Sequence, residues 1–503
     1  MTERERVEVR AGAYHDSVTL LQVSRAVAGV AGVAAAQVAM ATDLNVEVLR
    51  RMGFDVPAEA GPNDLVVAVR VEAEDAWPDA LAAVDRELGR TGGDRAPNAS
   101  SATVRPRTTG AAARASTATL AVVSVPGQHA FPEAMDALEA GLDVLVFSDN
   151  VPLEQEVRLK AEAERRGLLV MGPDCGTAVV GGVGLGFANV VRPGPVSLVA
   201  ASGTGAQQVM CLLDGAGVGV RHCLGVGGRD LSAVVGGAST RRALQMLDGD
   251  PGTDLIILVS KPPAPEVETA LTDVLAGLRT PVQTALLGPG RPDLTAAVDT
   301  AVQTLGLPWR EPRWWLAPAE RSGRYTRLLG AFCGGTLCDE AMIIASAELG
   351  PIASNIPLAG ATRVHAAGAV AKDHVMIDFG DDELTRGRPH PMIDGSLRAE
   401  WITQQAEQSA ADGTGLVLLL DVVLGHAAAQ DPARELVPAL ESAQALADVA
   451  VVISLCATDE DPQGRDGQAE RLRAAGASVH LSNAAATRKA LELLADDVKE
   501  GAG

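Results

Sequence analysis

Val196-Ser-Leu-Val-Ala-Ala-Ser-Gly-Thr-Gly-Ala206 is an apolar run that ends in a turn of small residues, and the residues from Gln207 to Leu213 have the pattern of a helix. A strand that leads through Gly and Thr into a helix makes an anion-binding turn, because the first N–H groups of a helix are unpaired and its dipole is positive there. Many α/β loops have this form without binding a ligand, so one turn alone leaves a purely structural interpretation open.

The same pattern returns in Leu328-Leu-Gly-Ala-Phe-Cys-Gly-Gly-Thr-Leu-Cys-Asp-Glu-Ala341, which again has a strand, a Gly/Thr turn and a helix. Two copies in one chain predict two related lobes, each of which presents a helix N-terminus to one shared anionic group. The residues that we expect to bind this group are Ser202, Gly203, Thr204 and Gly205 in the first turn, and Gly334, Gly335 and Thr336 in the second.

Composition limits the classes of function. The chain has 503 residues and a net charge of −22, without a cluster of Lys and Arg, which argues against nucleic acid as a partner. No apolar run approaches the ~20 residues of a membrane-spanning helix, so we expect a cytoplasmic protein without a membrane partner. The six cysteines are widely spread and form no Cys-x-x-Cys pair, so we expect reduced thiols and no zinc site built from cysteines. His374, Asp378 and His390 are the alternative metal ligands, but their spacing matches no recognised ligand set, so we predict no metal site.

The first part of the chain predicts a small module and a linker. Strand and helix patterns alternate from Val7 to Leu88, which is typical of a small ferredoxin-like α/β module, and we place it at residues 1–90. Residues 91–117 are rich in Gly, Ala, Ser, Thr, Pro and Arg without periodicity, so we predict a flexible linker there.

The rest of the chain predicts several doubly wound parallel α/β sheets of the Rossmann or flavodoxin-like kind, because strand and helix patterns repeat from Ala118 onward. A second lobe begins near Val196, and a connection rich in Pro, Gly, Arg and Trp, from Gly288 to Gly323, separates it from the last lobe. We expect the strands of that last lobe near Leu328, Val375, Leu416, Val449 and Ser478.

These residues resemble the succinyl-CoA synthetases, and most closely the FdrA family of acyl-CoA synthetase-like proteins. Four motifs follow the order of the synthetase α subunit: Gly172-Pro-Asp-Cys-Gly-Thr177, Ser202-Gly-Thr-Gly205, Gly225-Val-Gly-Gly-Arg-Asp230 and Asp250-Pro-Gly-Thr-Asp254. From Gly323 on, three motifs resemble the carboxyl-terminal lobe of the β subunit: Gly334-Gly-Thr-Leu337, Met376-Ile-Asp-Phe-Gly380 and Gly425-His-Ala427.

The resemblance also implies domain boundaries. It implies a truncated CoA-binding-like Rossmann domain at residues 118–193 and a ligase domain like that of the α subunit at residues 194–310. A carboxyl-terminal ligase domain like that of the β subunit follows at residues 322–498.

Four departures from the synthetase pattern change the expected chemistry. The stretch from Leu287 to Leu307 has no histidine to carry a phosphoryl group, and Ser260-Lys261 stands where the supporting glutamate is expected. The Gly-rich turn that receives the nucleotide end of CoA falls before Ala118, where only the linker is found. No stretch resembles the ATP-grasp domain, and no Walker-type loop replaces it. Such a chain cannot run the ATP-driven ligase cycle alone.

Charged residues near the turns are further candidates. Arg229 and Asp230 follow a glycine run; Arg229 suits bidentate contact with a phosphate or carboxylate, and Asp230 could orient it or a substrate amine in a catalytic role. A surface ion pair is the alternative for both. Lys261 ends a strand, where its charge suits an anionic substrate group.

Two histidines are candidates for the general base. His390 lies in the polar loop His-Pro-Met-Ile-Asp, and His426 follows the apolar run from Leu416 to Leu424. A histidine has a reference pKa near 6.5, which suits it to accept a proton from an amine or amide nucleophile. A structural histidine stays the alternative for each.

Three functions stay open. The first is an enzyme that transfers an acyl or carbamoyl group between phosphate and a small acceptor, which the resemblance links to oxamate and ureide catabolism. The second is an ATP-dependent acyl-CoA synthetase subunit whose nucleotide domain is on a separate chain, and the third is a non-catalytic assembly subunit. The sequence identifies no cofactor with certainty and leaves CoA binding open. We expect the chain to assemble with other subunits or with further copies of itself.

Overall fold

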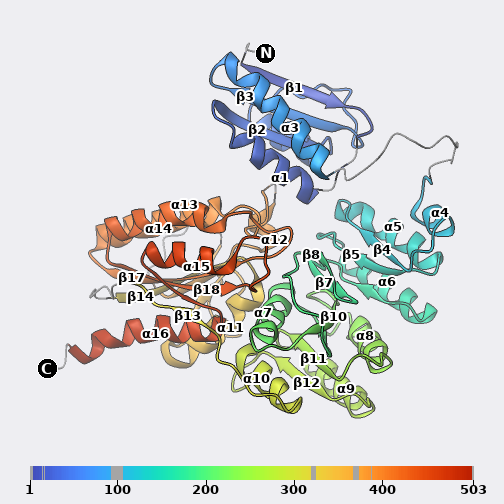
Figure 1. The fold of residues 1–503 in the computed structure, drawn as a ribbon, viewed down its shortest axis with the longest axis vertical. Helices are drawn as coiled ribbons and strands as arrows, with labels where there is room; N and C mark the ends of the chain where they lie inside the picture. Colours follow the sequence, from blue (N-terminus) through green and yellow to red (C-terminus); the bar gives the residue numbers. More distant parts are fainter. Residues whose placement is uncertain are drawn as a thin grey trace. The chain divides into compact units, whose positions relative to one another are not determined.

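The computed structural model describes residues 4–13, 15, 17–91, 106–318, 325–365, 373–386 and 388–500 (Figure 1). Its contacts divide the chain into two compact units. One comprises Met1–Pro106 with Arg386–Pro389, and the other comprises Arg107–Thr385 with His390–Gly503. Among the described residues, no helix has both the length and the apolar character needed to cross a bilayer.

The first unit contains a three-stranded antiparallel sheet in the order β1-β3-β2. The central strand β3 is apolar and buried on both faces, because helices α1 and α3 pack on one face and α2 packs on the other. This confirms the small α/β module. Its elements are β1 (Glu5–Arg10), α1 (Ser17–Ala28), β2 (Val33–Met40), α2 (Asp43–Arg51), β3 (Leu65–Val71), the 3₁₀ helix η1 (Glu74–Ala76) and α3 (Trp77–Thr91).

The second unit begins inside the predicted linker. Residues 92–105 lie outside the described residues, but the rest of the linker contains the short helix α4 (Thr109–Arg114), which corrects the prediction. The Thr108 side chain caps α4, and the Gly110 N–H donates to Asp136, 2.6 Å away. Six residues are too few to give a helical period in the sequence, so only these tertiary contacts define the helix.

A three-stranded parallel sheet follows, in the order β4-β5-β6. Its helices bury alanines and leucines at helical spacing, among them Ala130, Ala134, Ala137 and Leu138. Its elements are β4 (Leu120–Val123), α5 (Gly127–Glu139), β5 (Asp143–Val146), α6 (Leu153–Arg166) and β6 (Val170–Met171).

A six-stranded sheet has the order β12-β11-β9-β10-β7-β8. The hairpin β7–β8 pairs antiparallel with β10, so it belongs to this sheet and not to the domain expected to end at residue 193. The other four strands are parallel and almost wholly apolar, as strands covered on both faces are. The elements are β7 (Thr177–Val180), β8 (Val183–Gly186), β9 (Val196–Ala200), α7 (Gly203–Gly215), β10 (Val220–Gly225), α8 (Ala238–Asp248), β11 (Leu255–Ser260), α9 (Pro265–Ala276), β12 (Val282–Leu286) and α10 (Leu294–Thr304).

Helix α10 corrects a second prediction, because it lies within the stretch from Gly288 to Gly323 that was expected to be a connection. Its buried residues Leu294, Ala297, Val298, Ala301 and Val302 recur at helical spacing.

The last sheet has seven strands in the order β13-β19-β18-β17-β14-β16-β15, and all are parallel except β13. It contains every strand expected for this lobe. The elements are β13 (Trp314–Trp315), β14 (Tyr325–Phe332), α11 (Gly335–Leu349), β15 (Ala353–Ser354), β16 (Val375–Asp378), α12 (Asp382–Thr385), α13 (Ser396–Asp412), β17 (Gly415–Val423), α14 (Pro432–Leu446), β18 (Val449–Cys456), α15 (Arg465–Ala474), β19 (Ala477–His480) and α16 (Asn483–Glu500).

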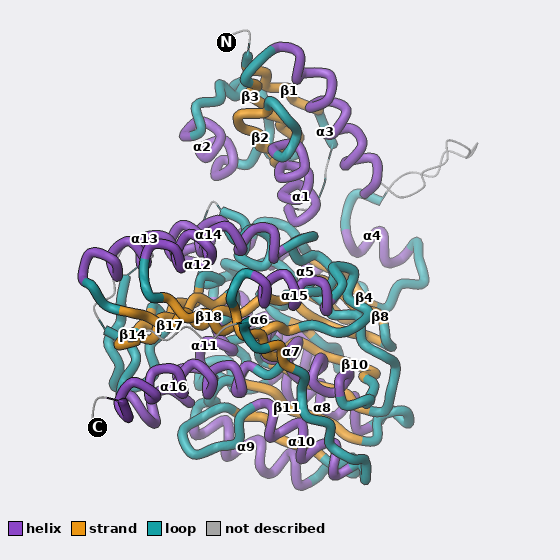
Figure 2. The backbone as a smooth tube through the Cα atoms, turned by 60° about the vertical axis from the view of Figure 1, so that its left-hand side comes forward, coloured by secondary structure: helices purple, strands orange, loops and turns teal. Residues whose placement is uncertain are grey.

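A layer of helices joins the two large sheets. Helices α7, α10, α11 and α16 share one buried core with strands of both sheets, and Figure 2 shows α7, α11 and α16 between them. Polar contacts cross the same layer. The fully buried Glu340 of α11 accepts hydrogen bonds from the Leu294 N–H of α10 and from the Asn483 side chain of α16, both at 2.7 Å.

Glu340 makes the stability of this layer depend on pH. Burial, with the nearby Asp293, raises the pKa of Glu340 from 4.5 to about 7, so the folded protein binds its proton more tightly than the unfolded chain does. That stabilisation is complete below about pH 4.5 and is lost as the pH rises through about 7. At one pKa unit per 1.36 kcal/mol, the loss amounts to about 3 kcal/mol. Glu340→Gln loses one of the two hydrogen bonds that Glu340 accepts, because an amide NH2 cannot accept, so it should melt below the unmodified protein near about pH 5. This deficit should shrink by several degrees near pH 8, because only the unmodified protein loses stability as the pH rises.

Melting curves followed by circular dichroism at the two pH values test this, with Glu348→Gln as a control on the exposed face of the same helix. An equal difference between Glu340→Gln and the unmodified protein at both pH values would show that Glu340 is ionised in the folded protein.

Candidate functional site

The two Gly/Thr turns meet in the second unit. Strand β9 leads through Ser202 into α7, and β14 leads through Cys333 and Gly334 into α11. The Ser202 hydroxyl accepts a hydrogen bond from the Gly205 N–H at 2.9 Å and donates one to the Thr336 hydroxyl at 2.6 Å. The expectation that the two helix N-termini lie together is therefore met.

Glycine is required at this contact, because each turn presses its backbone against a threonine of the other. A Cβ atom on Gly205 would lie 2.8 Å from Thr336 Cγ2. A Cβ atom on Gly334 would overlap Thr204 Cγ2 and lie 2.9 Å from Thr204 Cβ. Both threonines are buried, so the side chains of Ser202, Thr204 and Thr336 hold the turns together, instead of facing a ligand as expected from the sequence.

The open side of the junction is formed by the first residue of each helix. Gly203 is exposed and Gly335 is half-buried. Within the described part of the chain, their N–H groups have no hydrogen-bond partner, and no side chain caps α11. Unpaired N–H groups at two adjacent helix starts are the physical requirement of an anion site.

Lys261 extends from the end of β11 to the start of α11. Its ammonium lies 2.5 Å from the position that a Cβ atom on Gly335 would take, and 3.1 Å from the Asp339 carboxylate. Burial lowers the pKa of Lys261, but the carboxylates of Asp339 and Asp378 outweigh burial and hold this pKa above its usual value. Lys261 is thus a cation at the first turn of α11, and its contact with an anionic substrate group stays a prediction.

Asp378 ends β16 and is the other charged group at this turn. Its Oδ2 atom lies 2.9 Å from the same position over Gly335, and its Oδ1 atom accepts from the Gly380 N–H at 2.9 Å. Burial raises the pKa of Asp378 to about 7, against the influence of Lys261. Asn355 fixes the backbone of Asp378, because it accepts from the N–H at 2.9 Å and donates to the carbonyl at 2.8 Å.

His390 lies on the far side of Gly380. Its Nε2 atom is 2.8 Å from the position of a Cβ atom on Gly380, and its ring is 5.8 Å from that of Phe187. The Nδ1 atom accepts from the Met392 N–H at 3.2 Å, and burial, with Arg398, lowers the pKa of His390 to about 4. A neutral imidazole whose Nδ1 accepts carries its proton on Nε2. In this form His390 offers a hydrogen-bond donor and not the predicted general base.

His426 is exposed on the turn after β17. Gly425 and His426 are held against the segment that follows β8, since the His426 N–H donates to the Ala188 carbonyl at 2.8 Å. The His426 ring forms no hydrogen bond with any described residue, so its predicted role as a base stays a prediction.

Arg229 and Asp230 lie at a different junction, between α6 and α8. Asp230 is completely buried; its carboxylate accepts from Lys160 at 2.8 Å, from the Thr240 N–H at 2.9 Å and from the Thr240 hydroxyl at 2.6 Å. Arg229 pairs with Glu156 at 2.8 Å. With its oxygens occupied, Asp230 stabilises the start of α8, which corrects the expectation of a catalytic role.

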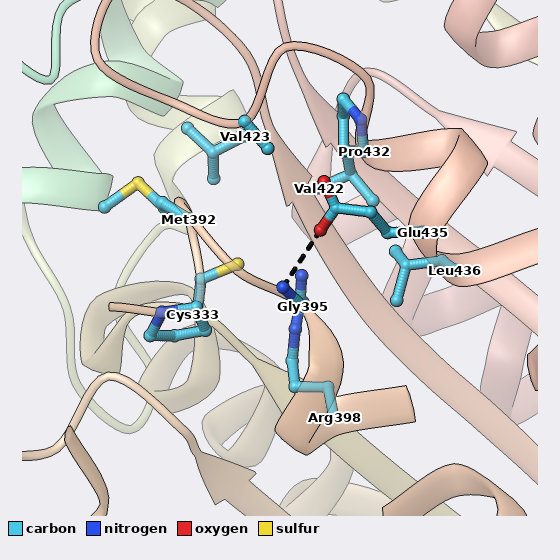
Figure 3. Close-up of a pocket in the computed structure, with 11 residues that line it drawn as sticks. Cys333, Met392, Gly395, Arg398, Val422, Val423, Pro432, Glu435 and Leu436 are labelled. Carbon is cyan, nitrogen blue, oxygen red and sulfur yellow. Dashed lines mark hydrogen bonds between the residues drawn. The ribbon is translucent and has the colours of Figure 1, made fainter. Parts of the chain in front are cut away.

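Behind the start of α11 lies a small cavity of about 10 Å³, lined by Cys333, Arg398, Glu435 and mostly apolar neighbours (Figure 3). Glu435 accepts from the Gly395 N–H at 3.0 Å. Arg398 donates to the Asp421 carbonyl at 2.7 Å and carboxylate at 3.1 Å, and that carboxylate accepts from the Cys333 N–H at 2.7 Å. The space holds about one water molecule, so it is too small for a substrate.

Sequence reasoning did not select Asp339 or Phe187 as site residues, and it considered Asp378 only as a metal ligand with His374 and His390. The argument that selected Lys261 also applies to Asp378 as an anion-site residue, because Met376-Ile-Asp-Phe-Gly380 is a strand that ends in a charged residue. Nothing in the sequence marks Asp339 or Phe187, which reach the site only through the packing of α11 and of the segment after β8.

The contact between the turns makes a direct prediction. Gly334→Ala should destabilise the protein by about 3 kcal/mol or more, because a methyl group is forced into a packed, buried contact. Thr204→Ala removes Cγ2 and Oγ1, so the double variant should lose less stability than the two single variants combined.

Denaturant unfolding of the four proteins measures this coupling. Gly228→Ala is the control, because its Cβ atom would meet nothing within 4 Å. Additive losses in the double variant would mean that the two turns do not touch in solution.

Comparisons with known proteins identify two domain types in the chain. Residues 1–105 match the model of the AllF heavy metal-associated domain, and residues 331–493 match that of the CoA-ligase domain. The described residues contain no group of three or more His, Cys, Asp or Glu that could hold a metal ion.

Related proteins match this chain over different shares of its length. The chain is 34% identical to the uncharacterized protein YahF of Escherichia coli K12, over 95% of this chain and 96% of that protein. It is 27% identical to succinate–CoA ligase subunit alpha 2 of Archaeoglobus fulgidus, over 30% of this chain and about half (52%) of that subunit.

Among solved structures, the dinucleotide-forming acetyl-coenzyme A synthetase 1 of Ca. Korarchaeum cryptofilum, in complex with phosphate and ADP, is 16% identical. The match covers 80% of this chain and 88% of the synthetase chain, with a TM-score of 0.31. The full-length relative and the CoA-ligase match carry the assignment. The chain belongs to the FdrA family of acyl-CoA synthetase-like proteins.

Proposed function

We propose that this protein binds an acyl phosphate at the junction of α7 and α11 and transfers its acyl or carbamoyl group to a small acceptor. The observation that carries the proposal is the Lys261 ammonium beside the uncapped first turn of α11. The phosphoryl group would accept hydrogen bonds from the N–H groups of Gly203 and Gly335 and pair with Lys261. Transfer of this kind fits the oxamate and ureide catabolism that the family resemblance implies.

For this reaction the protein has to position the acyl phosphate and the acceptor and to stabilise the negative charge on the phosphate. A nitrogen or oxygen of the acceptor attacks the carbonyl carbon, and the bond from that carbon to the phosphate oxygen breaks. The phosphate leaves with the electron pair, and the acceptor gives up one proton. Donors that already point at the phosphate stabilise the charge that develops there and need no rearrangement. His390, as a neutral donor, is near enough to Asp378 to contact the same substrate.

The charges at the site favour this reaction over phosphoryl transfer through a histidine. The synthetases that the chain resembles place a glutamate and a phosphohistidine between the two helix N-termini. Here Lys261 directly follows the strand β11, and the stretch from Leu287 to Leu307 has no histidine. A fixed cation suits the binding of an existing phosphoryl group, because it neutralises the charge of the bound anion.

The carboxyl end of the β4-β5-β6 sheet argues against CoA as the substrate. Helix α5 starts there without a side-chain cap, but a Cβ atom on its first residue, Gly127, would lie 2.7 Å from the Asn150 carbonyl oxygen and closer still to that of Asp149. The Asp149 carboxylate follows the end of β5, and Asp174, whose pKa burial and nearby carboxylates raise to about 7, follows the end of β6. Carbonyl oxygens and carboxylates at a helix start repel the pyrophosphate of CoA.

Calorimetric titration of the full-length protein with carbamoyl phosphate, acetyl phosphate, CoA and ATP tests the proposal. An acyl phosphate should bind, and Lys261→Met should weaken it at least about tenfold, because a hydrogen bond to a charged group contributes about 1.5–3 kcal/mol. Lys489→Met is the matched control, since Lys489 lies on α16 and pairs with Glu492.

Other results would overturn the proposal. Binding of CoA or ATP without binding of an acyl phosphate would favour a synthetase subunit that works with a separate nucleotide-binding chain. If none of the four compounds binds, the result would favour a non-catalytic assembly subunit.

A further inference from the structure

The anion site contains more negative charge than a simple phosphate site does. One cation, Lys261, faces two carboxyl groups, Asp339 at 3.1 Å and Asp378 across Gly335. Asp339 is 6% exposed and Asp378 is 7% exposed, so water screens neither group well. If both carboxyl groups were ionised, the three side chains would carry a net charge of −1 and would repel an anion at the start of α11.

The other titratable groups around Asp378 do not neutralise the excess negative charge of Lys261, Asp339 and Asp378. Asp381 on the same loop and Asp421 on β17 are both negative neighbours, and Arg398 pairs with Asp421 at 3.1 Å. Burial raises the pKa values of the Cys333 and Cys338 thiols far above their usual range, so both thiols are neutral. His390 is neutral as well. Among the described residues that face Asp378, Lys261 is thus the only cation not already paired with Asp421.

We propose that Asp378 takes part in anion binding in its protonated form, as a hydrogen-bond donor to the phosphoryl group, so that binding takes up one proton. This inference rests on the proposed function, because it assumes an anion at the start of α11. The neutral carboxyl group removes the excess negative charge and adds a donor beside Lys261 and the Gly335 N–H.

The geometry assigns the proton to one oxygen of Asp378. Oδ1 accepts from the Gly380 N–H at 2.9 Å, so Oδ2 is left to carry the proton, and Oδ2 is the oxygen that faces Gly335. Asn355 holds the backbone on both sides of this residue, which keeps the carboxyl group in place without an ion pair. Burial, which raises the pKa of Asp378 to about 7, leaves the group divided between its two forms near neutral pH.

The sign of the effect follows from this pKa. Below about pH 7 Asp378 is already protonated in the free protein, so anion binding takes up only a small fraction of a proton. Above about pH 7 each bound anion brings one proton, so the affinity should fall by up to about tenfold for each further pH unit.

Calorimetry of the full-length protein in two buffers with different heats of ionisation measures the proton directly. Sulfate and acetyl phosphate are the probes, with titrations near pH 6 and above pH 8. Proton uptake should rise from about zero toward about one per bound anion, and Kd should rise with it. Asp378→Asn replaces the acid by a neutral donor that can still accept from Gly380. The Asp378→Asn variant should take up about zero protons per bound anion. At every pH its Kd for the anion should stay near the value that the unmodified protein has at low pH.

Two variants control for general charge effects. Asp381→Asn lies on the same loop and is only partly buried, and Asp339→Asn removes the carboxylate that pairs with Lys261. Both should still take up a proton. Loss of uptake in Asp339→Asn, with uptake kept in Asp378→Asn, would overturn the assignment.

The remaining outcomes are distinct from one another. If Asp378→Asn binds more weakly at every pH while its melting temperature is unchanged, Asp378 acts as an ionised group and the inference is wrong. Binding that depends on Lys261 but takes up no proton at any pH would also overturn the inference and would leave the proposed function standing. Absence of any Lys261-dependent binding would remove the proposed function and the inference with it.

Discussion

The rest of the second unit depends on the contact between the first turns of α7 and α11. Gly205 and Gly334 lie against threonines of the facing turn, and Ser202 donates to Thr336 at 2.6 Å. This contact needs glycine at both positions, because no side chain fits between backbones that approach so closely. Behind it, one apolar core continues from strands of one large sheet into strands of the other. The two helix starts are therefore held at a fixed separation, with Gly203 and Gly335 on the open side.

Each sheet contributes to the junction in the same way. In each, one strand leads into the glycine turn, and a charged residue lies at the carboxyl end of a neighbouring parallel strand. Lys261 directly follows β11, which pairs with β9, and Asp378 is the last residue of β16, which pairs with β14. Carboxyl ends of adjacent parallel strands lie at one edge of a sheet, so the topology brings both of these side chains to Gly335.

The polar groups of the site are positioned by backbone N–H groups and by buried side chains. Asn355 braces Asp378, the Met392 N–H orients His390, and the pair of Arg398 and Asp421 supports Cys333 at the start of α11. Lys261, at 38% exposure, is the long side chain left facing the open edge. Such an arrangement fits a site in which binding changes the protonation of a carboxyl group and moves little else.

The sequence by itself determined the α/β class, the small N-terminal module, all strands expected in the last lobe and the two Gly/Thr turns. These follow from local apolar patterns and turn residues, which the chain records directly. It also contained a signal for α10, in the spacing of Leu294, Ala297, Val298, Ala301 and Val302, which the surrounding Pro and Gly obscured.

The tertiary structure decided which residues of those motifs face a ligand. It buried the hydroxyls of Ser202 and Thr336 in the contact between the turns, used Asp230 to stabilise α8, and brought Asp339 and Asp378 to Lys261. These outcomes depend on the burial of one group by another and on contacts between residues far apart in the sequence, such as the 70 positions between Lys160 and Asp230 and the 134 between Ser202 and Thr336. A local sequence pattern specifies neither the long-range contacts nor the burial. Distance along the chain does not determine distance in space, and burial determines whether a carboxyl group is charged.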